Sequence, residues 1–199
     1  MQNENENNPR VVILASRSGS NAAEIIGKFQ ERKLPVEFYG ASNRLPGKTP
    51  FYDKMKNLGV DAEHVPSPKD GIEPIMSFLQ NIKPNLVIMA GYMCRMPKEV
   101  VTKYLVLNIH PSILPFKYRG SEDAYKDAID RSDAITGCTV QRADEQYDTG
   151  PLIAQIGFVI PKRIVKAKDL DGLRAIGLAH EHALYPAVTY NILFERGGC

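Results

Sequence analysis

The amino-acid sequence predicts an α/β fold, in which a mostly parallel sheet carries helices on both faces and a late hairpin makes the sheet mixed. Apolar runs typical of buried strands alternate with segments of helical spacing along residues 11–110. Beyond residue 134, two strand-like runs follow each other without a helix between them. The alternation implies right-handed crossovers between parallel strands, and the hairpin adds antiparallel ones.

The elements are expected in the following order. A continuous apolar strand over residues 11–15 gives way to a small polar loop, and a helix begins at Ala22 with Asn21 as its cap. Further strands are expected at residues 36–41, 64–65, 86–90, up to 110, 135–141 and 152–160. Further helices are expected at residues 51–58, 72–82 and 170–194, the last with a bend at Pro186.

Length and composition favour one globular domain. A chain of 199 residues with 43% hydrophobic content can bury a substantial core, so we expect a disordered tail over residues 1–10 and a single domain over residues 11–199. The tail is rich in Asn and Glu and lacks the features of a signal peptide, and no apolar run is long enough to span a membrane. We therefore expect no membrane association.

Charge and cysteine content exclude several classes of protein. The formal net charge is +2 and no long basic block is present, so nucleic acid is not expected as a partner. The three cysteines, Cys94, Cys138 and Cys199, are widely separated. Their spacing argues against a zinc site and a disulfide framework, and it favours the cytoplasm as the location.

Three polar residues form the main candidate for a catalytic site. Asn108 and His110 lie two positions apart near the end of a strand, where i and i+2 share a face, so both can converge on one oxygen atom. Asp148 follows in a loop marked by glycine and proline. Each residue alone is also typical of an ordinary turn. Together they supply a polariser, an acid or base and an orienting carboxylate, as reactions at a carbonyl carbon require.

The loop after the first strand is a candidate anion site. Gly19, Ser20 and Asn21 are small residues between a strand and a helix, where backbone N–H groups and the helix dipole favour a phosphate. A plain tight turn is the alternative interpretation, because the segment matches neither the P-loop nor the dinucleotide-binding motif.

With these positions identified, the chain resembles the 10-formyltetrahydrofolate-dependent formyltransferases, in particular the phosphoribosylglycinamide formyltransferases. The resemblance rests on five segments that span nearly the whole chain. They are Gly19-Ser20-Asn21, Ala90-Gly91-Tyr92-Met93, residues 107–115 (LNIHPSILP), Asp148-x-Gly150-Pro151 and residues 181–186 (EHALYP).

The resemblance implies a Rossmann-like fold and transfer of a formyl group from 10-formyltetrahydrofolate, as cosubstrate and without a metal, to the amine of glycinamide ribonucleotide. Asn108, His110 and Asp148 fall on the family's catalytic positions. By the same resemblance, the substrate contacts are Gly19, Ser20, Asn21, Pro111 and Glu181, and the folate contacts are Met93, Cys94, Arg95, Met96 and Ala143. A monomer or a homodimer is expected.

The chain departs from the family pattern at Arg17, Leu178 and the Arg119-Gly120 pair, and the last of these is similar to methionyl-tRNA and sugar-amine formyltransferases. Three alternatives stay open. The chain could formylate another amine, it could hydrolyse formyltetrahydrofolate, or it could be a non-enzymatic nucleotide-binding domain. The first two classes usually carry an additional domain, and we expect none here.

Overall fold

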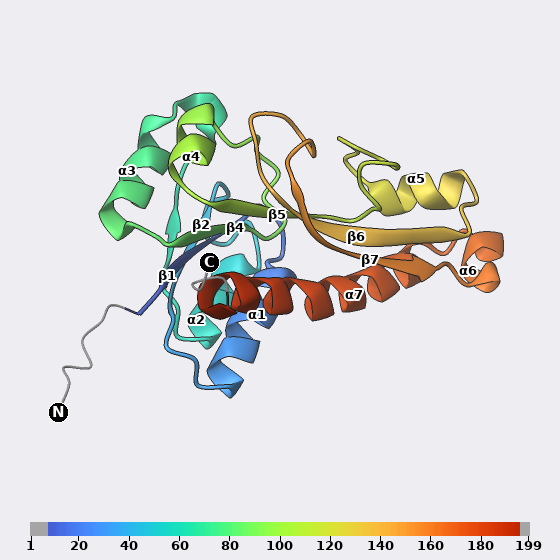
Figure 1. The fold of residues 1–199 in the computed structure, drawn as a ribbon, viewed down its shortest axis with the longest axis horizontal. Coiled ribbons are helices and arrows are strands. Elements are labelled where there is room, and N and C mark those ends of the chain that lie inside the picture. Colours follow the sequence, from blue (N-terminus) through green and yellow to red (C-terminus); the bar gives the residue numbers. More distant parts are fainter. Residues whose placement is uncertain (1–7, 196–199) are drawn as a thin grey trace. The chain divides into compact units, whose positions relative to one another are not determined.

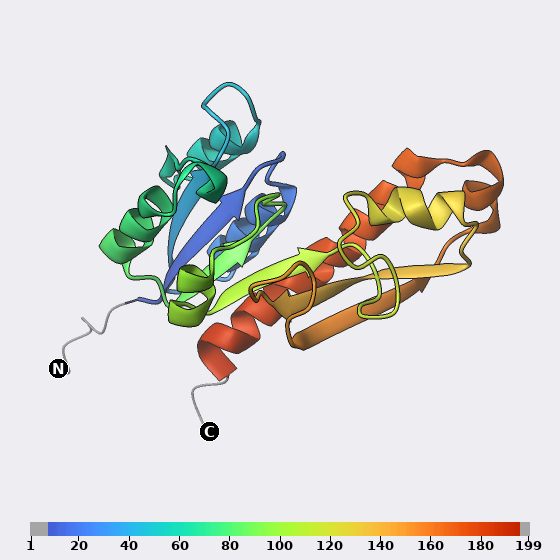
Figure 2. The ribbon, with the colours of Figure 1, turned by 90° about the horizontal axis from the view of Figure 1, so that it is seen from above.

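The computed structural model describes residues 8–195, which fall into two compact units, one ending at Val106 and the other beginning at Leu107. Most of the expected tail over residues 1–10 lies outside the described residues, as does Cys199. Both units are drawn in Figures 1 and 2.

The first unit is built on parallel strands. These are β1 (Arg10–Ala15), β2 (Glu37–Ser42), β3 (Ala62–His64) and β4 (Leu86–Met89). They hydrogen-bond in the order β3-β2-β1-β4, and every pair is parallel. The registers place Val11 opposite Phe38 on one side and opposite Leu86 on the other. Because β1 lies between two strands and helices cover both faces of the sheet, all its residues after Arg10 are buried.

Helices cover both faces of this unit. They are α1 (Ser20–Glu31), α2 (Phe51–Asn57), a 3-10 turn (Pro68–Asp70), α3 (Glu73–Ile82) and α4 (Lys98–Lys103). The chain moves outward from β1 to β3 and then returns past β1 to β4. Right-handed crossovers therefore put α1 and α2 on one face and α3 on the other, as Figure 1 shows.

Helix α1 begins two residues earlier than the sequence predicts. Ala22, Ile25, Ile26 and Phe29 are buried at helical spacing, as expected. The N-cap, however, is Gly19 in the left-handed region, and Asn21 lies buried within the first turn. The prediction of Asn21 as the cap is thus wrong.

The second unit is antiparallel. Its strands are β5 (Val106–His110), which begins at the unit boundary, β6 (Ile135–Arg142) and β7 (Leu152–Val159). β6 pairs antiparallel with both β5 and β7, which confirms the predicted hairpin. Its helices are α5 (Ala124–Asp130), α6 (Lys162–Ala167) and α7 (Leu170–Tyr190), followed by a π-helical turn (Asn191–Glu195). Helices α5 and α6 were not predicted from the sequence.

Packing in the second unit centres on α7. This helix lies against β6, β7 and α5, and Figure 2 shows it running along the hairpin. A buried cluster joins the helices to the end of β7, and its members are Tyr125, Ala128, Ile129, Ile160, Ile164 and Leu173. The predicted α/β fold, mostly parallel with helices on both faces and a C-terminal antiparallel hairpin, is confirmed. No helix within residues 8–195 has both the length and the apolarity that a membrane crossing requires.

Candidate active site

Strand β5 brings Asn108 and His110 to one face of the second unit. The two alternate with the buried residues Leu107 and Ile109, so their side chains point away from that core. Across the antiparallel ladder, Asn108 lies opposite Gln141 of β6. His110 is itself 95% buried, so its ring sits in a site of restricted water access.

Asp148 reaches these residues from the loop between β6 and β7. It adopts a left-handed backbone conformation with φ 55°, which aspartate tolerates better than most residues. Two residues later, Gly150 passes close to β6: a Cβ there would lie 1.8 Å from the backbone oxygen of Arg142. The Arg142 N–H donates to the Pro151 carbonyl at 2.9 Å and closes the loop. Glycine at position 150 thus allows the approach that places Asp148.

Four polar groups surround the Asp148 carboxylate, three as hydrogen-bond donors and one as the ring nitrogen of His110. Oδ2 lies 3.1 Å from His110 Nδ1 and accepts the Gly120 N–H at 2.9 Å. Oδ1 accepts the Gln141 amide at 2.9 Å and the Asn108 amide at 3.4 Å. The structure therefore brings Asn108, His110 and Asp148 together around one carboxylate, which is itself almost fully buried.

Gln141 is a residue that the sequence analysis missed. It is 1% exposed, and while its Nε2 donates to Asp148, its Oε1 is buried without a hydrogen-bond partner. Turning the amide over would set its oxygen against the carboxylate, so Asp148 fixes its orientation. One signal was present in the sequence, a glutamine at the end of the strand predicted at residues 135–141, whereas its place across the ladder from Asn108 is visible only in the structure.

A turn of the chain covers the other side of the histidine. The Tyr118 carbonyl accepts hydrogen bonds from His110 Nε2 at 2.9 Å and from the Ser121 N–H at 3.1 Å. Between them, the Gly120 N–H donates to Asp148. This turn, residues 118–121, thus offers an acceptor to the imidazole and a donor to the carboxylate.

These surroundings act on the protonation of His110 in opposite directions. Burial lowers the pKa of the imidazole, whereas the Asp148 carboxylate and the Tyr118 carbonyl raise it. The effect of burial is the largest, so the pKa lies below its ordinary value of 6.5. When the ring does take up a proton, it forms an ion pair with Asp148.

In the first unit, two loops that carry predicted site residues meet. The Ser16 N–H donates to the Gly91 carbonyl at 3.0 Å, and the Met93 N–H donates to Ser16 Oγ at 2.8 Å. The loop that carries Gly19 therefore lies beside the loop after β4. Helix α1 has no side-chain cap and no acidic residue in its first turn, which leaves its N-terminus suited to an anion.

The four adjacent residues predicted to contact folate differ in exposure. Met93 is 43% exposed and Arg95 is exposed, whereas Cys94 and Met96 are buried within the first unit. The Cys94 thiol accepts the Asn43 amide at 3.3 Å and lies 3.4 Å from Ser67 Oγ. Ala143 lies half-buried just after β6, in the second unit.

Glu181 is buried on α7, where it accepts the Tyr125 hydroxyl at 3.1 Å. Burial, and secondly the charge of Glu181, raise the pKa of the nearby Cys138 thiol to about 12. Glu181 thus takes part in a buried polar cluster of the second unit. Its assignment to the substrate phosphate stays a prediction.

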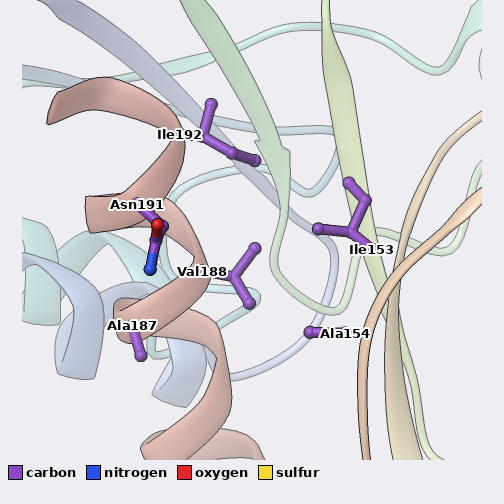
Figure 3. A pocket seen from close by; sticks show the side chains of 6 residues that line it. All are labelled: Ile153, Ala154, Ala187, Val188, Asn191 and Ile192. Carbon is purple, nitrogen blue, oxygen red and sulfur yellow. The ribbon is translucent and has the colours of Figure 1, made fainter. Parts of the chain in front are cut away.

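A cavity of about 240 Å³ lies elsewhere in the second unit, between β7 and the end of α7. Figure 3 shows its lining residues, which are Ile153, Ala154, Ala187, Val188, Asn191 and Ile192. It contains none of the predicted site residues, and apart from Asn191 it offers no polar side chain. Its chemistry is that of a packing gap rather than of catalysis. Among residues 8–195, no group of three metal-ligating side chains is close enough to hold an ion.

An α/β fold and an Asn-His-Asp constellation are the features expected of an enzyme that acts on a carbonyl carbon. Residues 9–189 match the formyl transferase family model. The chain belongs to this family.

Curated relatives come from two branches. Methionyl-tRNA formyltransferase of Helicobacter pylori is 29% identical over 170 residues, which are 85% of this chain and 52% of that protein. The chloroplastic phosphoribosylglycinamide formyltransferase of Vigna unguiculata is 33% identical over 152 residues, which are 71% of this chain and 47% of that protein. The chain spans about half the length of the curated relatives it matches.

The alignments with solved structures extend over a larger share of this chain and of the matched protein. Glycinamide ribonucleotide transformylase 1 from Symbiobacterium toebii has a TM-score of 0.84 and 28% identity, over 95% of this chain and 89% of that chain. Phosphoribosylglycinamide formyltransferase from Bacillus halodurans has a TM-score of 0.82 and 30% identity, over 94% and 96% respectively.

Proposed function

We propose that this chain transfers a formyl group from 10-formyltetrahydrofolate to the amine of glycinamide ribonucleotide, a step of de novo purine synthesis. The observation that carries the proposal is the meeting of three side chains: Asp148 contacts His110 Nδ1 at 3.1 Å and Asn108 Nδ2 at 3.4 Å. The fold match to phosphoribosylglycinamide formyltransferases supports the choice of acceptor.

Each of the three residues has a role in this proposal. The folate supplies an activated formyl carbon, and the Asn108 amide donates to the oxygen that gains negative charge during attack. His110 places positive charge beside that oxygen once it is protonated, and this electrostatic effect does not require a direct hydrogen bond. Asp148 holds the imidazolium and takes part in removing the proton from the attacking amine.

The remaining predicted residues would bind the two substrates. Gly19, Ser20 and Asn21 would hold the phosphate through the N-terminus of α1, a 12-residue helix without an acidic side chain in its first turn. Glu181 would lie near the same phosphate, and Pro111 would contact the rest of the acceptor. Met93, Cys94, Arg95, Met96 and Ala143 would line the folate site. Because Cys94 and Met96 are buried, they would act chiefly through backbone groups.

A second candidate function is formylation of methionyl-tRNA. It is favoured by the Helicobacter pylori relative and by the Arg119-Gly120 pair, which lies in the turn that contacts His110 and Asp148. The same catalytic groups would serve both acceptors, since in each reaction a primary amine attacks a formyl carbon.

For the first function, we further propose that the protein acts in the cytoplasm, as a monomer or homodimer, without a metal, membrane or nucleic-acid partner.

An assay of acceptor choice tests the proposal. The purified chain is incubated with 10-formyl-5,8-dideazafolate and either glycinamide ribonucleotide, methionyl-tRNA or no acceptor, and the deformylated folate is followed by absorbance. We expect product only with glycinamide ribonucleotide. Product only with methionyl-tRNA would replace the proposal with the second candidate, and product without an acceptor would indicate hydrolysis.

A further inference from the structure

One ionised side chain outside the three candidate catalytic residues holds the turn that contacts them. Asp133 Oδ2 accepts hydrogen bonds from Lys117 Nζ at 2.7 Å and from the Tyr118 hydroxyl at 2.5 Å. Its side chain is only 17% exposed. Two consecutive residues of the turn's entry are therefore tied to one carboxylate.

The protonation states of Asp133 and Tyr118 favour a stable hydrogen bond between them. Partial burial raises the pKa of Asp133, but hydrogen bonds from Lys117 and Tyr118 outweigh it and leave the pKa below its ordinary value. Burial, and secondly the hydrogen bond to Asp133, raise the pKa of the Tyr118 phenol to about 12. At neutral pH the carboxylate is charged and the phenol keeps its proton, so a charge-assisted hydrogen bond joins them.

Asp133 is itself fixed by the end of α5. Its N–H donates to the Ala128 carbonyl at 2.9 Å, and the Ser132 N–H donates to the Ile129 carbonyl at 3.0 Å. Ala128 and Ile129 belong to the buried cluster of this unit, and the Tyr118 ring packs against the same cluster. The core thus sets the position of the carboxylate, and the carboxylate sets the position of the Tyr118 side chain.

We propose that Asp133 is a positioning residue for His110, acting through Tyr118: by anchoring the tyrosine side chain, it keeps the Tyr118 carbonyl on His110 Nε2. A carbonyl oxygen can only accept, so this contact requires a proton on Nε2 and fixes the plane of the ring. The adjoining Gly120 N–H then reaches Asp148. The anchor thereby orients both partners of the histidine–carboxylate pair.

Loss of the anchor should change the pKa of His110 in one direction. Asp148 is the charged group of the described chain that faces His110, and Lys117 and Arg131 are the cations that act on Asp133. The Tyr118 carbonyl raises the pKa of His110. Releasing the anchor therefore lowers the pKa of His110, by about 0.5 to 1 pH unit for the loss of one neutral hydrogen bond.

The first test measures the histidine directly and needs no substrate. The chain contains four histidines, and their ring carbon signals are titrated by NMR, with His110 assigned by its loss in His110→Asn. We expect the His110 pKa to fall in both Asp133→Ala and Tyr118→Phe. The second variant removes a single hydroxyl and keeps the test valid if Asp133→Ala folds poorly. An unchanged His110 titration in both variants would overturn the proposal.

A matched control and a kinetic measurement complete the design. Asp130→Ala removes an aspartate three residues earlier, which is exposed and paired with Lys126, and it should leave His110 unchanged. The kinetic part rests on the proposed function. We expect Asp133→Ala to lower kcat about 10-fold, with the descending limb of its pH profile moved to lower pH, and KM nearly unchanged. A shifted NMR titration in a chain that formylates no acceptor would refute the proposed function and leave the positioning role intact.

Discussion

The two units provide their candidate binding and catalytic groups in different ways. In the first unit, the loops after β1 and β4 are joined by backbone groups and one hydroxyl, that of Ser16. In the second unit, the groups are side chains gathered on the Asp148 carboxylate. A backbone surface can hold a ligand but cannot exchange protons, whereas an imidazole and a carboxylate can. The joined loops of the first unit are therefore suited to binding, and the side chains around Asp148 in the second unit are suited to chemistry.

The largest effect should follow from removing the groups that act on the reacting carbon. We expect Asn108→Ala and Asp148→Asn each to lower kcat on the order of 10²-fold or more, because one donor or one carboxylate no longer acts on the transition state. Melting temperatures should show that both variants fold. Near-normal turnover in both variants would contradict the assignment of catalysis to these residues of the second unit.

A stability measurement tests why the Asp148 loop needs glycine. Gly150→Ala puts a Cβ 1.8 Å from the Arg142 carbonyl oxygen, so the loop must shift, at a cost of about 1–3 kcal/mol in the free energy of unfolding. Gly157→Ala, in the same hairpin, meets nothing closer than 3.4 Å and serves as the control. Equal urea midpoints for the two variants would contradict this account of the loop.

In the first unit, the corresponding residue is Gly19. Gly19→Ala adds a Cβ 2.6 Å from the Phe51 ring at a φ of +67°, so we expect a stability loss of about 1–2 kcal/mol and a higher KM for the phosphorylated acceptor. Gly27→Ala, later in α1, meets nothing within 4 Å and should stabilise the helix slightly. A fall in kcat with unchanged KM for Gly19→Ala would contradict a role of the Gly19 loop in binding the acceptor.

A smaller effect is expected from Gln141, which donates a hydrogen bond to Asp148. Gln141→Leu removes a donor at 2.9 Å from the carboxylate, and we expect kcat to fall about 10-fold, equivalent to about 1.4 kcal/mol. KM should stay within about twofold, as should both constants for Gln146→Leu, which alters an exposed residue of the same hairpin loop. A change confined to KM would show that Gln141 acts on binding instead.

The smallest effect concerns pH and stability. The pKa of His110 is lowered in the folded chain, so between the folded value and 6.5 the unfolded chain binds more protons. The contribution of neutral His110 is complete above about pH 6.5 and is lost as the pH falls below it. We expect the free energy of unfolding of the wild type to decline more steeply below pH 6.5 than that of His110→Asn, as measured by urea unfolding. Parallel declines would contradict the sign of the shift.

The sequence predicted the elements whose signal is local and strong. The apolar runs at β1 and β4 and the helical spacing of α1 and α3 suffice, because burial on both sides leaves no polar positions in the strands. Helices α5 and α6 have only seven and six residues. Segments of this length are stabilised by tertiary packing, here by the buried cluster of the second unit, and periodicity cannot detect them.

The candidate site shows the same limit. The shared strand face of Asn108 and His110 follows from their spacing, and the structure brings Asp148 to the pair. The Tyr118 carbonyl could not be predicted, because every residue has a carbonyl and only the folded turn selects one. The cap of α1 was misassigned for a related reason: Phe51, distant in sequence, leaves room only for glycine at position 19.

The crowding around Asp148 links two events of the proposed reaction. An ionised carboxylate has about four lone-pair sites, and four neighbours occupy those of Asp148 when His110 is protonated on both ring nitrogens. A proton released by the attacking amine can settle there only after one neighbour withdraws. The Asn108 amide makes the longest of the four contacts, at 3.4 Å, so its hydrogen bond to Asp148 is the weakest and the easiest to break. When this amide turns toward the formyl oxygen, it frees a lone pair of Asp148 for the proton. Polarisation of the formyl group and deprotonation of the attacking amine are thereby coupled through one side-chain movement.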